Sequence, residues 1–241
     1  MYHEAALRSL NDARRNGADE RSAASWYYST KRRFVLHFGM KTHYERFLPH
    51  WLPPGETLFV TFRLAGSLPQ RIIAQLLEER ELLRQAPAAR LSAAERYSEQ
   101  KQFFARFDAQ LDNAAYGPQW LAEPAVAAIV SEALHFRHAK AYELICFCLM
   151  SNHVHMVVQL PADAPDFMRT LQSLKMNTAL RANKILGREG QFWQRESYDH
   201  IVRDGNEMQR IVAYVLENPV KAGLTDNWQN WPYTYWSAEH Q

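Results

Sequence analysis

The chain has 241 residues, of which 47% are hydrophobic, enough to bury a sizeable core in one large domain with appendages. A formal net charge of +2 makes it mildly basic, so charge alone neither requires nor excludes a nucleic-acid partner. No segment approaches about 18 uncharged apolar residues, and residues 1–30 lack an apolar stretch, so we expect neither a membrane span nor a signal peptide. Cys146 and Cys148 are two apart on an expected strand, where a disulfide is difficult, which favours reduced thiols in a cytoplasmic protein.

Three segments are expected along the chain. Residues 1–55 form a basic and aromatic N-terminal extension. Residues 56–225 form the main domain, with a helical insertion at about 75–138, and residues 226–241 form a C-terminal tail.

The main domain alternates strand and helix patterns. Runs of β-branched and aromatic residues predict strands at 57–65, 142–150, 153–160 and 192–203. Apolar residues at helical spacing predict a helical hairpin over 70–113, broken near Pro87, and helices at 125–138, 166–186 and 207–217. The last helix is expected to stop before Pro219. This order indicates a ferredoxin-like α+β fold, an antiparallel sheet with helices on one face.

His153 and His155 carry the first chemical signal. Residues two apart on a strand point to the same face, so the two imidazoles can share a metal ion. A pair of hydrogen-bonded histidines on a half-exposed sheet face is the simpler alternative, and the spacing alone does not decide between them.

Tyr214 and Asn218 are four apart on the last helix, which makes them neighbours on one surface. If that helix crosses the face that carries the histidines, two imidazoles and one amide oxygen make a three-ligand metal site beside a phenol. Packing of Tyr214 and helix-end hydrogen bonding by Asn218 are the alternatives.

Several motifs resemble those of a known family. The segment 149–155, Leu-Met-Ser-Asn-His-Val-His, resembles the HUH motif of single-tyrosine transposases, and segments 190–200, 214–224 and 231–237 resemble their REP-associated branch. The resemblance covers about residues 57–66 and 140–237. The long helical insertion and the N-terminal extension depart from the compact family pattern.

The resemblance implies an enzyme that cuts and rejoins single-stranded DNA. His153 and His155 then bind a divalent metal, Mg²⁺ or alternatively Mn²⁺, with Asn218 as a less certain third ligand, and Tyr214 is the nucleophile. The family reaction produces a 5′-phosphotyrosine and a free 3′-hydroxyl. The implied partner is single-stranded DNA, with hairpin-forming repeats expected, and the protein is expected to be a monomer or a homodimer.

Cations are expected to contact the DNA in two places, and for the first of them a solvated charged face is an equally good explanation. One is a basic track without acidic residues, composed of Arg169, Lys175, Arg181, Lys184 and Arg188. The other combines Trp26 with Lys31, Arg32 and Arg33, where a ring can stack on unpaired bases while the cations hold phosphates.

Other assignments stay open at this stage. Tyr198 is the alternative nucleophile, although packing on the sheet is its favoured role. The whole protein can instead be a non-catalytic single-stranded nucleic-acid-binding module, or a hydrolase of the same topology in which water attacks.

Overall fold

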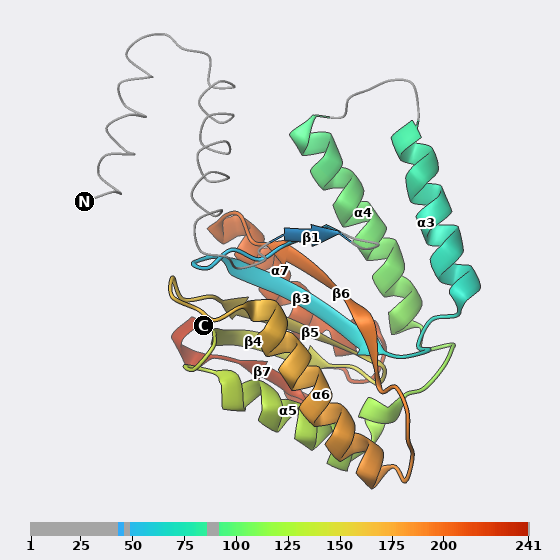
Figure 1. The fold of residues 1–241 in the computed structure, drawn as a ribbon, viewed down its shortest axis with the longest axis vertical. Helices are drawn as coiled ribbons and strands as arrows, with labels where there is room; N and C mark the ends of the chain where they lie inside the picture. The colour runs from blue at the N-terminus through green and yellow to red at the C-terminus, as the bar shows by residue number, and fades with distance from the viewer. Residues whose placement is uncertain (1–42, 46–48, 86–91, 241) are drawn as a thin grey trace. The chain divides into compact units, whose positions relative to one another are not determined.

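The computed structural model describes residues 43–45, 49–85 and 92–240, and the elements keep the labels of Figure 1. The main sheet has five strands in the order β6-β3-β5-β4-β7, and every neighbouring pair is antiparallel. Its strands are β3 (Thr57–Leu64), β4 (Glu143–Leu149), β5 (His153–Gln159), β6 (Trp193–Ile201) and β7 (Thr234–Trp236). Two short strands, β1 (His43–Glu45) and β2 (Pro49–Trp51), form a separate hairpin.

Five helices are described. They are α3 (Gln70–Gln85), α4 (Ala93–Asp112), α5 (Pro124–Arg137), α6 (Phe167–Ile185) and α7 (Gly205–Lys221). Short polar side chains begin three of them: Ser92 starts α4 with a capping box, and Asp166 and Asp204 cap α6 and α7. Three-residue 3₁₀ turns lie at Trp120–Ala122, Trp228–Asn230 and Ala238–His240. Among the described helices, none is both long and apolar enough to cross a membrane.

The chain order β3-α5-β4-β5-α6-β6 confirms the ferredoxin-like prediction. Two segments differ from the expected boundaries. Only α3 and α4 are inserted, because α5 is one of the two helices of the ferredoxin-like unit. Residues 234–236, expected in a tail, pair with β4 as the fifth strand, and Tyr235 also stacks on Phe147 there.

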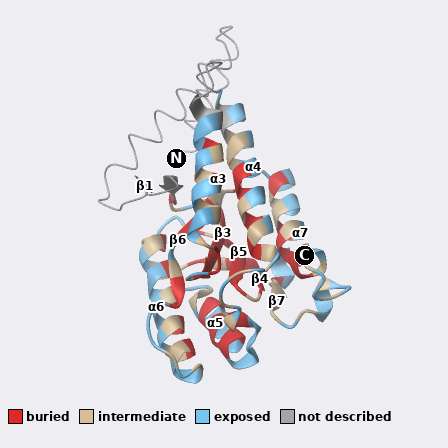
Figure 2. Ribbon diagram, turned by 90° about the vertical axis from the view of Figure 1, so that its right-hand side faces the viewer, coloured by how far each residue is buried: buried red, intermediate tan, exposed pale blue. Residues whose placement is uncertain are grey.

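The sheet is covered on both faces. On one face, α5 and α6 pack against the even-numbered residues of β3, such as Val60 and Phe62. On the other face, α4 and α7 pack around Phe59. Figure 2 shows α5 and α6 on one side of the sheet and α3, α4 and α7 on the other. The expected arrangement therefore holds for α5 and α6, while the inserted α4 and the closing α7 cover the second face.

Helix α7 runs past its expected end. Pro219 lies inside it, and the helix ends at Lys221. A proline in the last turn removes one backbone donor. Asn218 and Pro219 are both buried, and Ala222 still donates to the carbonyl of Asn218, so packing and the remaining hydrogen bonds offset that loss.

Candidate active site

His153 and His155 lie side by side on β5, on the face covered by α4 and α7. Both side chains are fully buried, and their Nε2 atoms are 2.9 Å apart. Two nitrogens this close can both bind one ion at the bond lengths of about 2.1 Å usual for such ligands. The period of the strand and the cover provided by the two helices therefore create a paired-nitrogen site.

The Nδ1 atoms of the two histidines, which face away from each other, each have a polar partner. His153 Nδ1 is 2.6 Å from Asn152 Oδ1, and His155 Nδ1 is 2.7 Å from Thr61 Oγ1. Asn152 also donates from its amide nitrogen to the carbonyl of Leu111, which directs its oxygen at His153. His153 therefore carries its proton on Nδ1 and turns the lone pair of Nε2 towards its neighbour, the arrangement of a metal-binding imidazole.

Burial also fixes the charge of the pair. It lowers the pKa of His153 to about 3 and that of His155 to about 4, so both imidazoles are neutral at pH 7. A neutral imidazole is the form that binds metals.

Helix α4 brings two carboxylates to the histidines. Asp108 Oδ2 is 3.5 Å from His155 Nε2, and Asp112 Oδ1 is 3.6 Å from His153 Nε2. One ligand atom from each of the four residues lies within 4.8 Å of the others. Burial raises the pKa of both carboxyl groups, and the charge of Asp108 raises that of Asp112 further. The four side chains form a cluster that fits a divalent metal ion.

Unpaired atoms in this cluster support the fit. Asp108 Oδ1 and Asp112 Oδ1 are buried and have no hydrogen-bond partner within the described part of the chain. Such orphaned acceptors are costly unless a donor or a cation satisfies them.

Tyr214, on α7, is directed at the same cluster. Its ring centroid is 5.6 Å from that of His155, and its hydroxyl donates a hydrogen bond to Asp108 Oδ2. The ring is partly buried, and Lys221 Nζ lies 4.2 Å from its centroid. The phenol, the histidine pair and a cation therefore come together on one face.

Asn218 follows one turn later on α7. Its side chain is fully buried, and neither its amide oxygen nor its amide nitrogen has a hydrogen-bond partner among the described residues.

Tyr198, the alternative nucleophile, has different surroundings. It lies on β6, 7% exposed, and its ring stacks on Phe104 with centroids 4.1 Å apart. Burial raises the pKa of its phenol, with a contribution from the charge of Asp199. This packing matches the role in sheet packing that we favoured for Tyr198 from the sequence.

Sequence reasoning missed Asp108 and Asp112. The signal was present, because Asp108 lies four residues after Phe104 and three before Leu111, both buried on the apolar face of α4. An acidic residue at a core position of an amphipathic helix is rarely buried without a partner.

Residues 122–218 match the family model described as IS200-like transposase. The matched segment contains the histidine pair, Tyr198, Tyr214 and Asn218, and it begins after α4. Residues 122–218 are therefore similar to IS200-like transposases.

Two curated proteins that are similar to this chain carry more specific names. A REP-associated tyrosine transposase of Haemophilus influenzae is 26% identical over 102 residues, which cover 39% of this chain and 58% of the relative. One from Escherichia coli is 23% identical over 95 residues, covering 39% and 54%. The chain thus spans a little over half the length of these curated relatives. A solved structure of a REP-associated tyrosine transposase bound to a REP hairpin has 18% identity and a TM-score of 0.47, covering 79% of this chain and 80% of that one.

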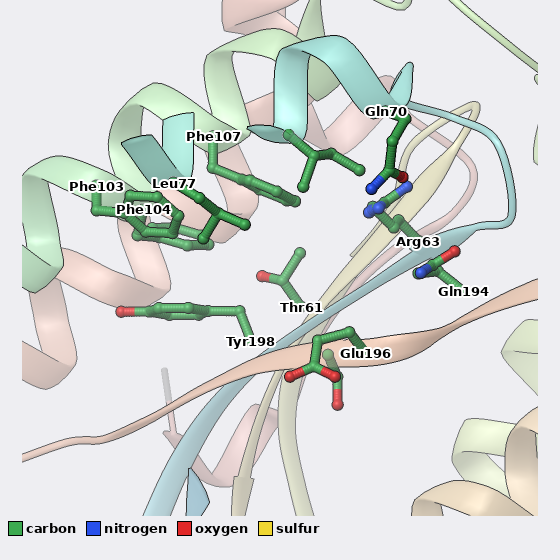
Figure 3. Close-up of a pocket in the computed structure, with 12 residues that line it drawn as sticks. Thr61, Arg63, Gln70, Leu77, Phe103, Phe104, Phe107, Gln194, Glu196 and Tyr198 are labelled. Carbon is green, nitrogen blue, oxygen red and sulfur yellow. The ribbon is translucent and has the colours of Figure 1, made fainter. Parts of the chain in front are cut away.

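A pocket, drawn in Figure 3, is lined by Thr61 and Arg63, which pair with His155 and His153 across the β3–β5 ladder. Phe103, Phe104 and Phe107 form its apolar end, while Arg63 and Gln70 lie near each other at the opposite end. Thr61, which contacts His155, lines the pocket as well. The pocket therefore adjoins the cluster of two histidines and two aspartates.

Arg63 is the pocket's buried cation. It pairs with His153 across the β3–β5 ladder, and 6% of its surface is exposed. Its guanidinium donates to Ser67 and lies 5.6 Å from the ring centroid of Phe107, and among the described residues no carboxylate forms an ion pair with it. Burial lowers its pKa to about 10. Aromatic walls and unused guanidinium donors suit a flat ring with hydrogen-bond acceptors.

The expected basic track lies along α6 and the residues that follow it, across the sheet from the histidine pair. It consists of Arg169, Lys175, Arg181, Lys184 and Arg188. Lys175 donates to the carbonyls of Gln194 and Arg195, and Arg181 forms a two-point ion pair with Glu132. Arg188 donates to Asn183 and covers the ring of Trp120. The track is thus remote from the cluster and partly engaged in internal contacts. Trp26, Lys31, Arg32 and Arg33 lie outside the described residues.

Proposed function

We propose that this protein is a metal-dependent tyrosine transposase that cuts and rejoins single-stranded DNA through Tyr214. The observation that carries the proposal is the meeting of two elements far apart in sequence. The phenol of Tyr214, on α7, lies against the imidazole of His155, on β5, and is hydrogen-bonded to the carboxylate that contacts the same imidazole. A nucleophile beside a metal-binding cluster is what phosphodiester cleavage requires.

Each group has a task in the proposed reaction. His153 and His155 would hold a divalent ion, since their Nε2 atoms lie side by side. Asp108 holds the hydroxyl of Tyr214 in place and is the acceptor for its proton. The bound ion would polarise the scissile phosphate and stabilise the charge that develops on it. The phenolic oxygen forms a bond to phosphorus as the bond to the 3′-oxygen breaks, and the departing oxygen takes a proton from water. The products are a 5′-phosphotyrosine and a free 3′-hydroxyl. A second 3′-hydroxyl reverses the step and joins new ends without an external energy source.

The substrate follows from the relatives. Both curated relatives are named REP-associated transposases, and the solved relative is bound to a REP hairpin. We take a hairpin-bearing single strand as the substrate, with one unpaired base entering the pocket of Arg63. The aromatic walls suit base stacking, and the guanidinium suits the acceptors of a base edge.

The test uses the full chain, Mg²⁺ and a pool of single-stranded hairpins with randomised flanks. A label at the 3′ end should become covalently attached to the protein, while a label at the 5′ end should be released on a fragment with a 3′-hydroxyl. Tyr214→Phe should abolish the adduct, and Tyr198→Phe should retain it.

Other outcomes select the alternatives. An adduct that persists in Tyr214→Phe would reassign the nucleophile. Cleavage without any adduct would indicate attack by water, and binding that neither needs metal nor leads to cleavage would indicate a binding module.

A further inference from the structure

The cluster of two histidines and two aspartates joins two parts of the chain. One part lies inside the segment that matches the family model, and the other lies outside it. His153, His155 and Tyr214 lie in the segment that matches the transposase family, residues 122–218. Asp108 and Asp112 lie before it, on α4 of the inserted hairpin. The family match therefore does not account for the two carboxylates.

The spacing of the two aspartates suits joint binding. Residues four apart lie on one face of a helix, and here that face covers the histidine pair, one carboxylate against each imidazole. Asp108 is 1% exposed and Asp112 24%, so solvent reaches the cluster mainly beside Asp112.

Without a cation this arrangement is unfavourable. Two carboxylates repel each other, and each has an oxygen without a hydrogen-bond partner in the described residues. A protein normally hydrogen-bonds or pairs such groups, and a divalent ion satisfies all of them together.

We propose that Asp108 and Asp112 bind the same divalent ion as His153 and His155, so that the inserted hairpin completes the metal centre of this transposase. The inference rests on the proposed function only for the use of that ion in DNA cleavage. Two imidazoles and an amide carry no charge, whereas two carboxylates neutralise a divalent cation and supply the oxygen ligands that Mg²⁺ and Mn²⁺ favour. Asp108 has a second task, since the oxygen that faces His155 also accepts the hydrogen bond of Tyr214. The hairpin thereby sets the position of the nucleophile relative to the metal.

The experiment measures Mn²⁺ binding to the full chain without DNA, by calorimetry and electron paramagnetic resonance. The variants are Asp108→Asn, Asp112→Asn and the double variant, with Asp163→Asn as control, because Asp163 is an exposed aspartate in the loop after β5. Each single variant should weaken Mn²⁺ binding at least about 10-fold, the double variant more, and the control not at all. Pulsed resonance should still detect imidazole nitrogens around the ion that remains bound.

The stability of the metal-free variants is a second measurement, because a metal-binding role and a purely structural role predict opposite changes in it. In EDTA, Asp108→Asn and Asp112→Asn should unfold at the same or a higher denaturant concentration than the natural chain, because each removes one of two carboxylates that repel each other. A purely structural role would instead lower stability and leave Mn²⁺ affinity unchanged in the variants that fold. Unchanged Mn²⁺ affinity in the folded double variant would overturn the inference. An adduct that survives in Tyr214→Phe would overturn the proposed nucleophile without affecting metal binding, so the two failures are distinguishable.

Discussion

The hydroxyl of Tyr214 donates a hydrogen bond to Asp108, a residue 106 positions earlier in the chain. The same carboxylate oxygen is 3.5 Å from His155 Nε2. One buried side chain of the inserted hairpin therefore joins the nucleophile proposed on α7 to the histidine pair on β5.

Tyr198→Phe should keep adduct formation within about 2-fold of the natural chain. The substitution removes only a hydroxyl, and the ring can continue to stack on Phe104. The rate of adduct formation on a 3′-labelled hairpin checks this, with Tyr214→Phe measured in parallel. Loss of the adduct in Tyr198→Phe, in a variant that melts normally, would make Tyr198 the nucleophile.

Arg63→Gln should weaken binding of single-stranded hairpins about 10-fold, because it removes the buried cation of the pocket beside the metal cluster. The comparison is Arg169→Gln, which removes an exposed cation from α6 on the other side of the sheet. Fluorescence anisotropy in the Tyr214→Phe background measures both. A larger loss for Arg169→Gln would place the strand along the basic track that we expected from sequence.

Asn218→Leu should stabilise the chain in EDTA by about 1 kcal/mol, because the buried amide has no hydrogen-bond partner among the described residues and leucine has a similar size. If the amide oxygen is a metal ligand, as the family resemblance implies, the same variant should bind Mn²⁺ about 10-fold more weakly. Urea unfolding and calorimetry measure the two effects. Unchanged Mn²⁺ affinity would remove Asn218 from the ligand set.

His200 should make the metal-free protein sensitive to acid. Burial, with the charges of Arg203 and Lys101, lowers its pKa to about 4, whereas an unfolded chain gives about 6.5. Between these values the unfolded chain binds a proton that the folded chain does not, so stability is lost as pH falls through this window. In His200→Gln, the loss of unfolding free energy between pH 7 and pH 4.5 should be about 1–2 kcal/mol smaller. Urea unfolding in EDTA at both pH values measures it, with the exposed His240→Gln as control, and an equal loss in both variants would contradict the assignment.

The ferredoxin-like core could be predicted because its signals are local. The strand patterns at 57–65 and 153–160 fall within one or two residues of β3 and β5, since the apolar runs end at residues such as Gly66 and Pro161. β7 was not predicted, because three residues carry too little pattern and the strand forms only by pairing with β4.

Only the site residues that lie within the family motifs could be predicted from the sequence. The strand period put His153 and His155 together, and the helical period put Tyr214 beside Asn218. Asp108 and Asp112 come from an insertion whose packing depends on tertiary contacts, such as the edge-to-face contact of Phe59 with Phe104. Helical spacing alone does not show which part of the sheet such a hairpin covers.

The most direct test of the account is to locate the covalently bound nucleotide. The full chain is trapped on a hairpin-bearing single strand with Mg²⁺, the DNA is digested to a short remnant, and the tryptic peptides are sequenced by mass spectrometry. The account predicts a nucleotide attached by its 5′-phosphate to Tyr214, and no remnant when EDTA replaces Mg²⁺. A remnant on Tyr198 or on any other side chain would contradict it.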